Sequence, residues 1–274
     1  MVNKHLLNRS LFTTLVAVFG LIAQFGCGGG TQVTPYNNNA SADKRGEDIV
    51  AEYLKRDAAP FRKIRIRFTI KADGQADKIY ELDNWRKQTA EGTTTLSQIL
   101  KPVEDSDLGS LTFEPKGKSA TVTTYVPSHD EFRETPTTKM FFGGLTAGEL
   151  LGDWDKFTYK LLGEKEVGGR KCYEVEGKFK PLAETVVTRM TVLFRQDNYG
   201  LVEVHFFDNN DKEIRTYRVT EFNEDPVHPY AAKTEVDNPI YHAKITIEIL
   251  NVEFPSTLDD AMFTRDKLKS FAKK

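Results

Sequence analysis

The stretch "KIRIRFTIK" (63–71) decides the fold class of this 274-residue chain. Its isoleucines and Phe68 alternate strictly with arginine, threonine and lysine. A period of two is typical of a β-strand with one buried face and one solvated face, which is the usual condition of an antiparallel sheet. Gly74 then lies at the centre of residues 72–76, which predict a turn into a second strand.

Similar patterns predict strands along most of the remaining chain, and turn residues of the Gly, Asn and Asp type separate most of them. About twelve antiparallel strands with few helices predict a mainly β (α+β) protein with one strongly curved sheet or a barrel, because flat open sheets rarely grow so wide. The further predicted strands are 78–86, 93–100, 110–114, 120–126, 156–162, 170–179, 187–195, 201–207, 213–222, 231–236 and 243–254.

Three segments predict helices instead of strands. "GEDIVAEYLKRDAAPF" (46–61) places apolar residues at helical spacing, and Pro60 ends the pattern. A short helix is expected near 146–151, within a glycine-rich apolar segment. The tail 257–271 is expected to form one helix with Leu258, Met262 and Phe263 facing inward.

The N-terminus has the features of a secretory signal. Lys4 and Arg9 precede an apolar run, residues 11–25, that is shorter than the roughly 20 residues of a membrane-spanning helix. The run ends at Gly26-Cys27, which resembles the cleavage site of a bacterial lipoprotein signal, although Gln24 stands where that pattern has leucine. The alternative is an ordinary export signal with a chance cysteine.

The lipoprotein interpretation divides the chain into three parts: a signal peptide at 1–26, a flexible linker at 27–45, and one domain at 46–274. Cys27 would carry the lipid anchor, and no other cofactor is expected. Two or more acyl chains hold a protein firmly on a membrane. The mature chain would be slightly acidic, which does not suit nucleic acid as a partner.

No residues form a recognisable catalytic or metal-binding pattern, so no catalytic residue and no metal ligand are predicted. The histidines lack metal-ligand spacing, and His205 alternates with Val204 and Phe206, which predicts a surface position. Cys172 lies within a strand pattern and is expected to be small, buried and chemically inert. "DNND" (208–211) is better explained as a hairpin turn than as a calcium loop.

The informative feature is an apolar face shared by several predicted strands. A curved sheet with such a lining could hold a lipid chain, as small barrels hold apolar ligands, or it could be an ordinary filled core. Periodicity alone leaves both possibilities open. The candidate acyl-chain cavity residues are Ile66, Phe68, Ile70, Trp85, Phe141, Phe142, Val204, Phe206, Ile245 and Ile247.

Six ordered segments share a resemblance to a known family. They are "WRK" (85–87), "YVPSHDEFRE" (125–134), "FFGG" (141–144), "YKLLGEKEVGGRKCYEVEG" (159–177), "LVEVHFFDNNDKEIRTYRV" (201–219) and "HAKITIEILNVEFPSTLDDAMFTRDKL" (242–268). Together, from about Ile49 to Phe271, they resemble the bacterial outer-membrane lipoprotein-sorting family, the relatives of LolA and LolB, although Val126 stands where the family has leucine.

The resemblance implies a half-open antiparallel barrel with helices across its mouth, and a cavity that takes lipid or lipoprotein acyl chains. The expected function is a non-enzymatic, lipid-anchored envelope protein, in the outer membrane and facing the periplasm, with a further envelope protein as a possible partner. The alternative is a structural or assembly lipoprotein that uses the curved sheet as a protein-docking surface. An envelope hydrolase is disfavoured, because no nucleophile, base and orienting group converge.

Overall fold

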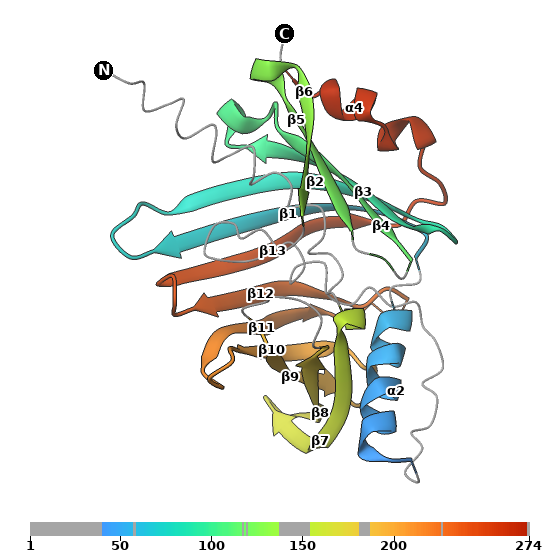
Figure 1. Cartoon of the computed structure of the whole chain (residues 1–274), viewed down its shortest axis with the longest axis vertical. Helices are drawn as coiled ribbons and strands as arrows, with labels where there is room; N and C mark the ends of the chain where they lie inside the picture. The colour runs from blue at the N-terminus through green and yellow to red at the C-terminus, as the bar shows by residue number, and fades with distance from the viewer. Residues whose placement is uncertain are drawn as a thin grey trace.

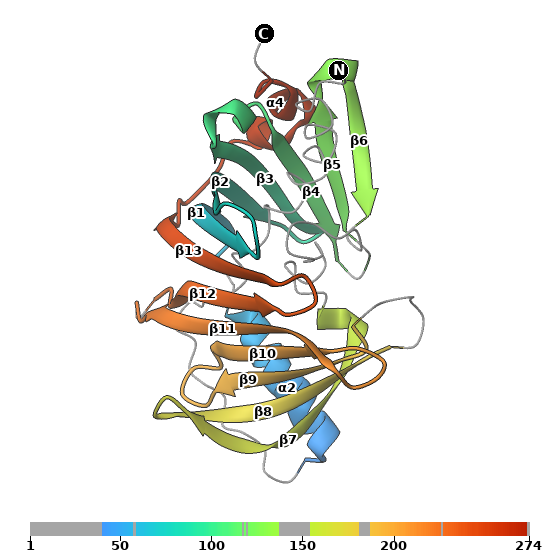
Figure 2. The same ribbon diagram turned by 90° about the vertical axis from the view of Figure 1, so that its left-hand side faces the viewer.

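Thirteen antiparallel strands form one sheet in the part of the chain that the computed structural model describes, residues 40–56, 59–116, 118, 120–136, 154–180, 187–225 and 227–272. The sheet is curved and unclosed, with β6 and β7 at its two edges (Figures 1 and 2). The predicted mainly β class is confirmed. The strands are β1 (Phe61–Ala72), β2 (Lys78–Gln88), β3 (Gly92–Lys101), β4 (Gly109–Pro115), β5 (Thr121–Val126), β6 (Glu131–Pro136), β7 (Phe157–Val167), β8 (Arg170–Phe179), β9 (Arg189–Arg195), β10 (Leu201–Phe207), β11 (Glu213–Asn223), β12 (Tyr230–Asn238) and β13 (Ala243–Glu253).

The strand order divides the sheet into two meanders. From β1 to β6, and from β7 to β13, each strand pairs with its neighbour in sequence. The two meanders are joined where β1 pairs with β13, in a register that places Phe68 opposite Ile247. The strands that come first and last in the sequence, β1 and β13, therefore lie side by side at the centre of the sheet (Figure 1).

The alternation predicted for β1 is confirmed, because Ile64, Ile66, Phe68 and Ile70 are all buried. The other predicted strands are present, with ends that differ by a few residues. β6 was not predicted, because "EFRETP" is short, charged and lacks an apolar alternation. Such sequences are typical of edge strands, where charge and proline discourage pairing with another chain.

Helix α2 (Ala42–Lys55) packs against β7 on the side toward which the sheet curves (Figure 1). It begins inside the segment 27–45 that was expected to be a linker. The backbone N–H of Lys44 donates to Ser41 Oγ at 3.2 Å, so Ser41 caps the helix. Gly46 allows a close approach, because a Cβ atom there would lie only 2.7 Å from the backbone nitrogen of Lys160.

The C-terminal tail does not form the single helix that was expected over 257–271. It forms a 3-10 turn, η6 (Asp260–Phe263), and a short helix, α4 (Arg265–Lys269). The break lies at Thr264, which has an extended backbone and caps α4 by accepting a hydrogen bond from the Lys267 N–H. Leu268 is the buried residue of α4, and Phe263 is only partly buried.

The face of the sheet that carries Arg65 and Asp83, which we call the outer face, bears a ladder of ion pairs. Arg65 Nε lies 2.8 Å from Asp83 Oδ1. Glu81 accepts from two cations, with Arg67 Nη2 at 2.7 Å and Lys101 Nζ at 2.9 Å. Hydrogen bonds from Lys101 and Arg67 lower the pKa of Glu81 from its ordinary value. The charged carboxylate therefore favours the folded state.

The stabilising effect of Glu81 should depend on pH. Because its pKa is lower in the folded than in the unfolded chain, its contribution is present above the unfolded value of about 4.3 and is lost as the pH falls through the folded value. We expect Glu81→Gln to lower the melting temperature at pH 7, and the difference from wild type to shrink below about pH 4. Thermal unfolding across this range tests it, with Glu164→Gln at an exposed position of β7 as the control. A difference that stays constant with pH would contradict the prediction.

Candidate functional site

Seven of the predicted cavity residues lie on one face of the sheet, opposite to the outer face, which we call the inner face. Ile70 of β1 lies opposite Ile245 of β13, beside the pair formed by Phe68 and Ile247. The row continues through β12 and β11 to Val204 of β10. The seven residues are Ile66, Phe68, Ile70, Val204, Phe206, Ile245 and Ile247.

The inner face is well packed where these residues lie. Each of the seven is at most 8% exposed, and all belong to one apolar cluster that extends from β2 through β1 and β13 to β7. Helix α2 contributes Tyr53 to this cluster, with ring centroids 5.1 Å from Trp154 and 5.2 Å from Phe194. Strands β7 to β11 curve around this helix (Figure 2). At this end, the protein's own helix therefore occupies the inner face.

Trp85 does not lie with the other predicted cavity residues. It is opposite Leu96 on the outer face, in a second cluster that includes Leu268 and Phe271. Successive residues of a strand point to opposite faces, so Trp85 cannot share a face with Leu82. The C-terminal segment packs against this cluster, so α4 covers the outer face and not the mouth of a half-barrel. Cys27, Phe141, Phe142 and the short helix expected near 146–151 lie outside the described residues.

The other end of the inner face is polar, which was not predicted. On β2 the inward positions change from Tyr80 and Leu82 to Asn84 and Arg86. Five hydroxyl residues on β3, β4 and β5 continue this face, and each is at most 2% exposed. Period-two alternation in "TTTLSQILK" and "SLTFEP" carries the signal, because it separates these hydroxyls from the leucines. The five residues are Thr95, Ser97, Ser110, Thr112 and Thr124.

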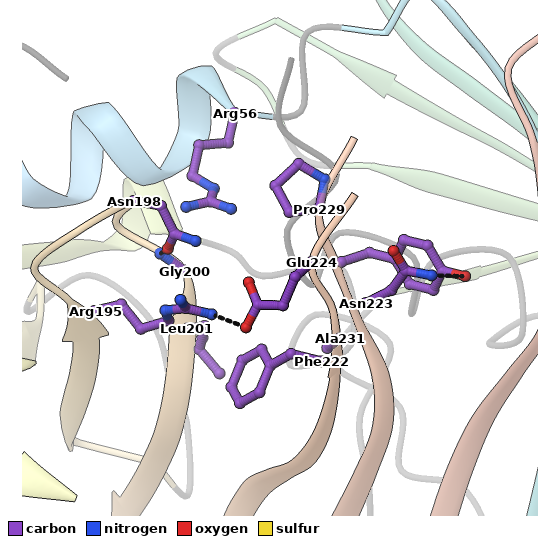
Figure 3. A pocket seen from close by; sticks show the side chains of 11 residues that line it. Arg56, Arg195, Asn198, Gly200, Leu201, Phe222, Asn223, Glu224, Pro229 and Ala231 are labelled. Carbon is purple, nitrogen blue, oxygen red and sulfur yellow. Dashed lines mark hydrogen bonds and ion pairs between the residues drawn. The ribbon is translucent and has the colours of Figure 1, made fainter. Parts of the chain in front are cut away.

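A small pocket with both charged and apolar residues in its lining lies near the end of α2, between the β9–β10 turn and the adjoining ends of β11 and β12 (Figure 3). Its cavity volume is only about 10 Å³, close to the space that one water molecule needs. Arg195 is 8% exposed and donates to Glu224 Oε1 and Asp197 Oδ2, each at 2.6 Å. Burial raises the pKa of Asp197, but the hydrogen bonds and charge of Arg195 outweigh burial and hold it below its ordinary value. A space of this size is too small for an acyl chain.

Cys172 is fully buried, and its Sγ donates to the carbonyl oxygen of Arg170 at 3.5 Å. Burial raises the pKa of its thiol, so little nucleophilic thiolate forms at neutral pH. His205 lies on the outer face, as its alternation predicted, with Nδ1 3.0 Å from Glu213 Oε2. The "DNND" segment forms the predicted hairpin turn, in which Asp208 accepts from two backbone N–H groups.

Two further searches covered the described part of the chain. Among those residues, no cluster of three or more histidine, cysteine, aspartate or glutamate side chains is placed to hold a metal ion. In the same described part, none of the helices combines the length and the apolar character needed to span a membrane.

Comparison with known proteins connects this arrangement to a family. A family model described only as "Uncharacterized protein" matches residues 91–270. No curated protein matches the chain. A DUF1329 family protein from Desulfovibrio piger has a similar structure, with a TM-score of 0.76 and 19% identity, and the match covers 84% of this chain and 100% of that one.

Two further solved structures are similar. A putative outer-membrane lipoprotein-sorting protein domain from Vibrio parahaemolyticus matches with a TM-score of 0.73 and 13% identity, over 83% of this chain and 99% of that one. A LolA superfamily protein from Nitrosomonas europaea matches with a TM-score of 0.66 and 12% identity, over 83% and 99%. At these identities the similarity establishes the fold, which is LolA-like.

Proposed function

We propose, from the premise that this chain belongs to the uncharacterized protein family matched over residues 91–270 and has a LolA-like fold, that it binds lipid or lipoprotein acyl chains on its inner face. Its role would be lipoprotein sorting or lipid transfer in the bacterial envelope. The ligand would be held without any covalent change, so the protein would not be an enzyme.

The observation that carries the proposal is the apolar row across the centre of the sheet. It joins Ile70, Ile245 and Val204 on strands that belong to both meanders. Because these residues are already buried, an acyl chain would have to replace the groups that now cover them, and it would gain about 25 cal/mol for each Å² of its own apolar surface removed from water. The sheet is unclosed, so it can change its curvature to admit a ligand without breaking a closed ring of strand pairings.

The proposed location is the outer membrane, with a lipid anchor at Cys27 and the domain facing the periplasm. The basic and apolar order of the N-terminus supports this location, as does the name of the Vibrio neighbour, which refers to outer-membrane lipoprotein sorting. Gly28 after the cysteine favours the outer membrane under the sorting rule of enteric bacteria. Envelope lipoproteins and membrane lipids would then be the available ligands.

Crosslinking from two neighbouring phenylalanines tests the binding face. Phe206 is 8% exposed on the inner face, whereas Phe207 lies on the outer face beneath the guanidinium of Arg189. We expect a photoreactive benzoylphenylalanine at position 206, in the full chain and in living cells, to crosslink to alkyne-labelled lipid. The same group at position 207 serves as the matched control and should give several-fold less labelled product. Mass spectrometry of the crosslinked protein identifies the attached molecule.

Equal labelling at positions 206 and 207, or no labelling at either, would contradict the acyl-chain proposal. A crosslink from position 206 to another protein would favour the alternative, a docking lipoprotein without lipid cargo. One observation supports that alternative, because Tyr53 and Trp154 already fill the inner face near β9. Lipid binding and protein docking therefore differ in which molecule contacts the inner face away from β9, a lipid or another protein.

A further inference from the structure

Three hydroxyl groups at the polar end of the inner face have no hydrogen-bond partner in the described structure. They are Thr95 Oγ1, Ser110 Oγ and Thr112 Oγ1, and all three residues are 0% exposed. A buried hydroxyl without a partner costs folding free energy, and buried polar groups in native proteins are nearly always paired. Three such groups on one surface are therefore candidates for hydrogen bonds to a bound molecule.

The three hydroxyls form a compact group on β3 and β4. Thr95 lies opposite Thr112, and the next inward pair is Ser97 and Ser110. Ser97 differs from the other three, because its Oγ accepts a hydrogen bond from Asn84 Nδ2 at 3.2 Å. The protein thus pairs one of these four hydroxyls within its own structure, and the other three are buried without a partner.

The charge around the hydroxyls is positive. Arg62 of β1 lies directly opposite Arg86 of β2, and Thr95 is the neighbour of Arg86 on β3. Both arginines are at most 3% exposed. Among the described residues, two carboxylates lie on the same side: Glu114, two residues after Thr112 on β4, and Glu131 of β6, which pairs with Arg133 on the same strand. The three guanidinium groups outnumber these carboxylates, which favours an anionic partner, and each guanidinium can donate to oxygen.

The cluster of hydroxyls and arginines also borders the apolar row of the inner face. Ile64 lies opposite Asn84 in the same register that places Ile66 opposite Leu82. One continuous surface therefore changes from aliphatic side chains to hydroxyls and arginines within a few residues. An amphiphile with an oxygen-rich anionic head and apolar tails matches both parts at once.

We propose that Thr95, Ser110 and Thr112, with Arg62 and Arg86, bind the phosphate of a phospholipid headgroup, while its acyl chains lie along the apolar row. This inference rests on the proposed function and specifies its ligand class. Phosphate oxygens accept hydrogen bonds from hydroxyl and guanidinium donors, and such bonds are stronger when they are shielded from water. The surface would then select phospholipids over uncharged lipids with the same tails.

The double variant Thr95→Val/Thr112→Val tests the role of the hydroxyls, because valine keeps the shape of threonine and replaces the hydroxyl, which can donate and accept, with a methyl group. Without lipid, we expect a melting temperature equal to or above that of wild type, since no protein bond is lost. The affinity for a phospholipid should fall by at least about tenfold. The control is Thr123→Val on β5, which is 7% exposed on the outer face and should leave binding unchanged.

Binding is measured by calorimetry on the full chain, kept in a non-ionic amphipathic polymer. The probes are dihexanoyl-phosphatidylglycerol and dihexanoylglycerol, which share their acyl chains and differ in the phosphate headgroup. Wild type should bind the phospholipid at least about tenfold more tightly, and the double variant should bind both probes alike.

The outcomes separate this inference from the proposed function. If wild type binds both probes equally, the headgroup inference is wrong and acyl-chain binding stands. If wild type binds neither probe, both proposals fail. A clear drop in the melting temperature of the lipid-free double variant would show that the hydroxyls serve the protein's own structure, which would also overturn the inference.

Discussion

Tyr53→Ala is expected to lower the free energy of unfolding by about 3–5 kcal/mol, the range for truncating a buried aromatic side chain. Tyr53 is 3% exposed, and its ring contacts join α2 to Phe194 of β9 and to Trp154, which lies in a 3-10 turn just before β7. Loss of the ring would leave a cavity between the helix and the sheet. Urea denaturation measures the effect, and an unchanged m-value would show that the unfolded state has not altered.

The matched control is Leu54→Ala, one position further along the same helix. Leu54 is 46% exposed, so we expect a change within about 0.5 kcal/mol. The double comparison separates packing from helix propensity, because alanine is a strong helix former at both positions. Similar losses for the two variants would contradict the conclusion that α2 is held by its contacts on the inner face.

Cys27→Ser is expected to abolish lipid labelling completely, because serine lacks the thiol that would carry the acyl groups. Cells expressing the full chain are grown with an alkyne fatty acid, and the purified protein is tested for label. Cys172→Ser is the internal control, since the chain has two cysteines and Cys172 is fully buried with a raised thiol pKa. Label should remain in that variant.

An unlabelled wild-type protein would support the other explanation of the N-terminus, an ordinary export signal with a chance cysteine. Label that persists in Cys27→Ser would place the lipid elsewhere in the chain. Membrane fractionation gives a second readout, because a protein with two acyl chains stays on the membrane through a high-salt wash.

Most of the sheet could be predicted from sequence, because burial of one face makes apolar and polar residues alternate along a strand. "KIRIRFTIK" shows this alternation along its whole length, and its apolar residues are the buried ones. β6 could not be predicted, because an edge strand of charged residues buries too little to create a pattern. The tail was predicted as one helix, and apolar spacing alone did not reveal the extended break at Thr264.

The candidate site was predictable only in part. Alternation selects which residues of one strand share a face, and seven apolar candidates do lie together. It does not select which face of a strand is the inner one, so Trp85 was assigned to the wrong side of β2. The hydroxyl cluster could not be predicted, because threonine is common in strands and its meaning depends on the register between β3 and β4.

The pairing of β1 with β13 has a consequence for the order in which the sheet assembles. Within each meander, neighbouring strands are close in sequence and can pair as soon as both are present. The central pair is different, since it joins residues such as Lys63 and Glu253 that are 190 positions apart. Contacts at such a separation form slowly, because a long loop must close before they contribute. A chain made from its N-terminus keeps β1 as an exposed edge until β13 has been made, so protection from aggregation matters most during the synthesis of β7 to β12.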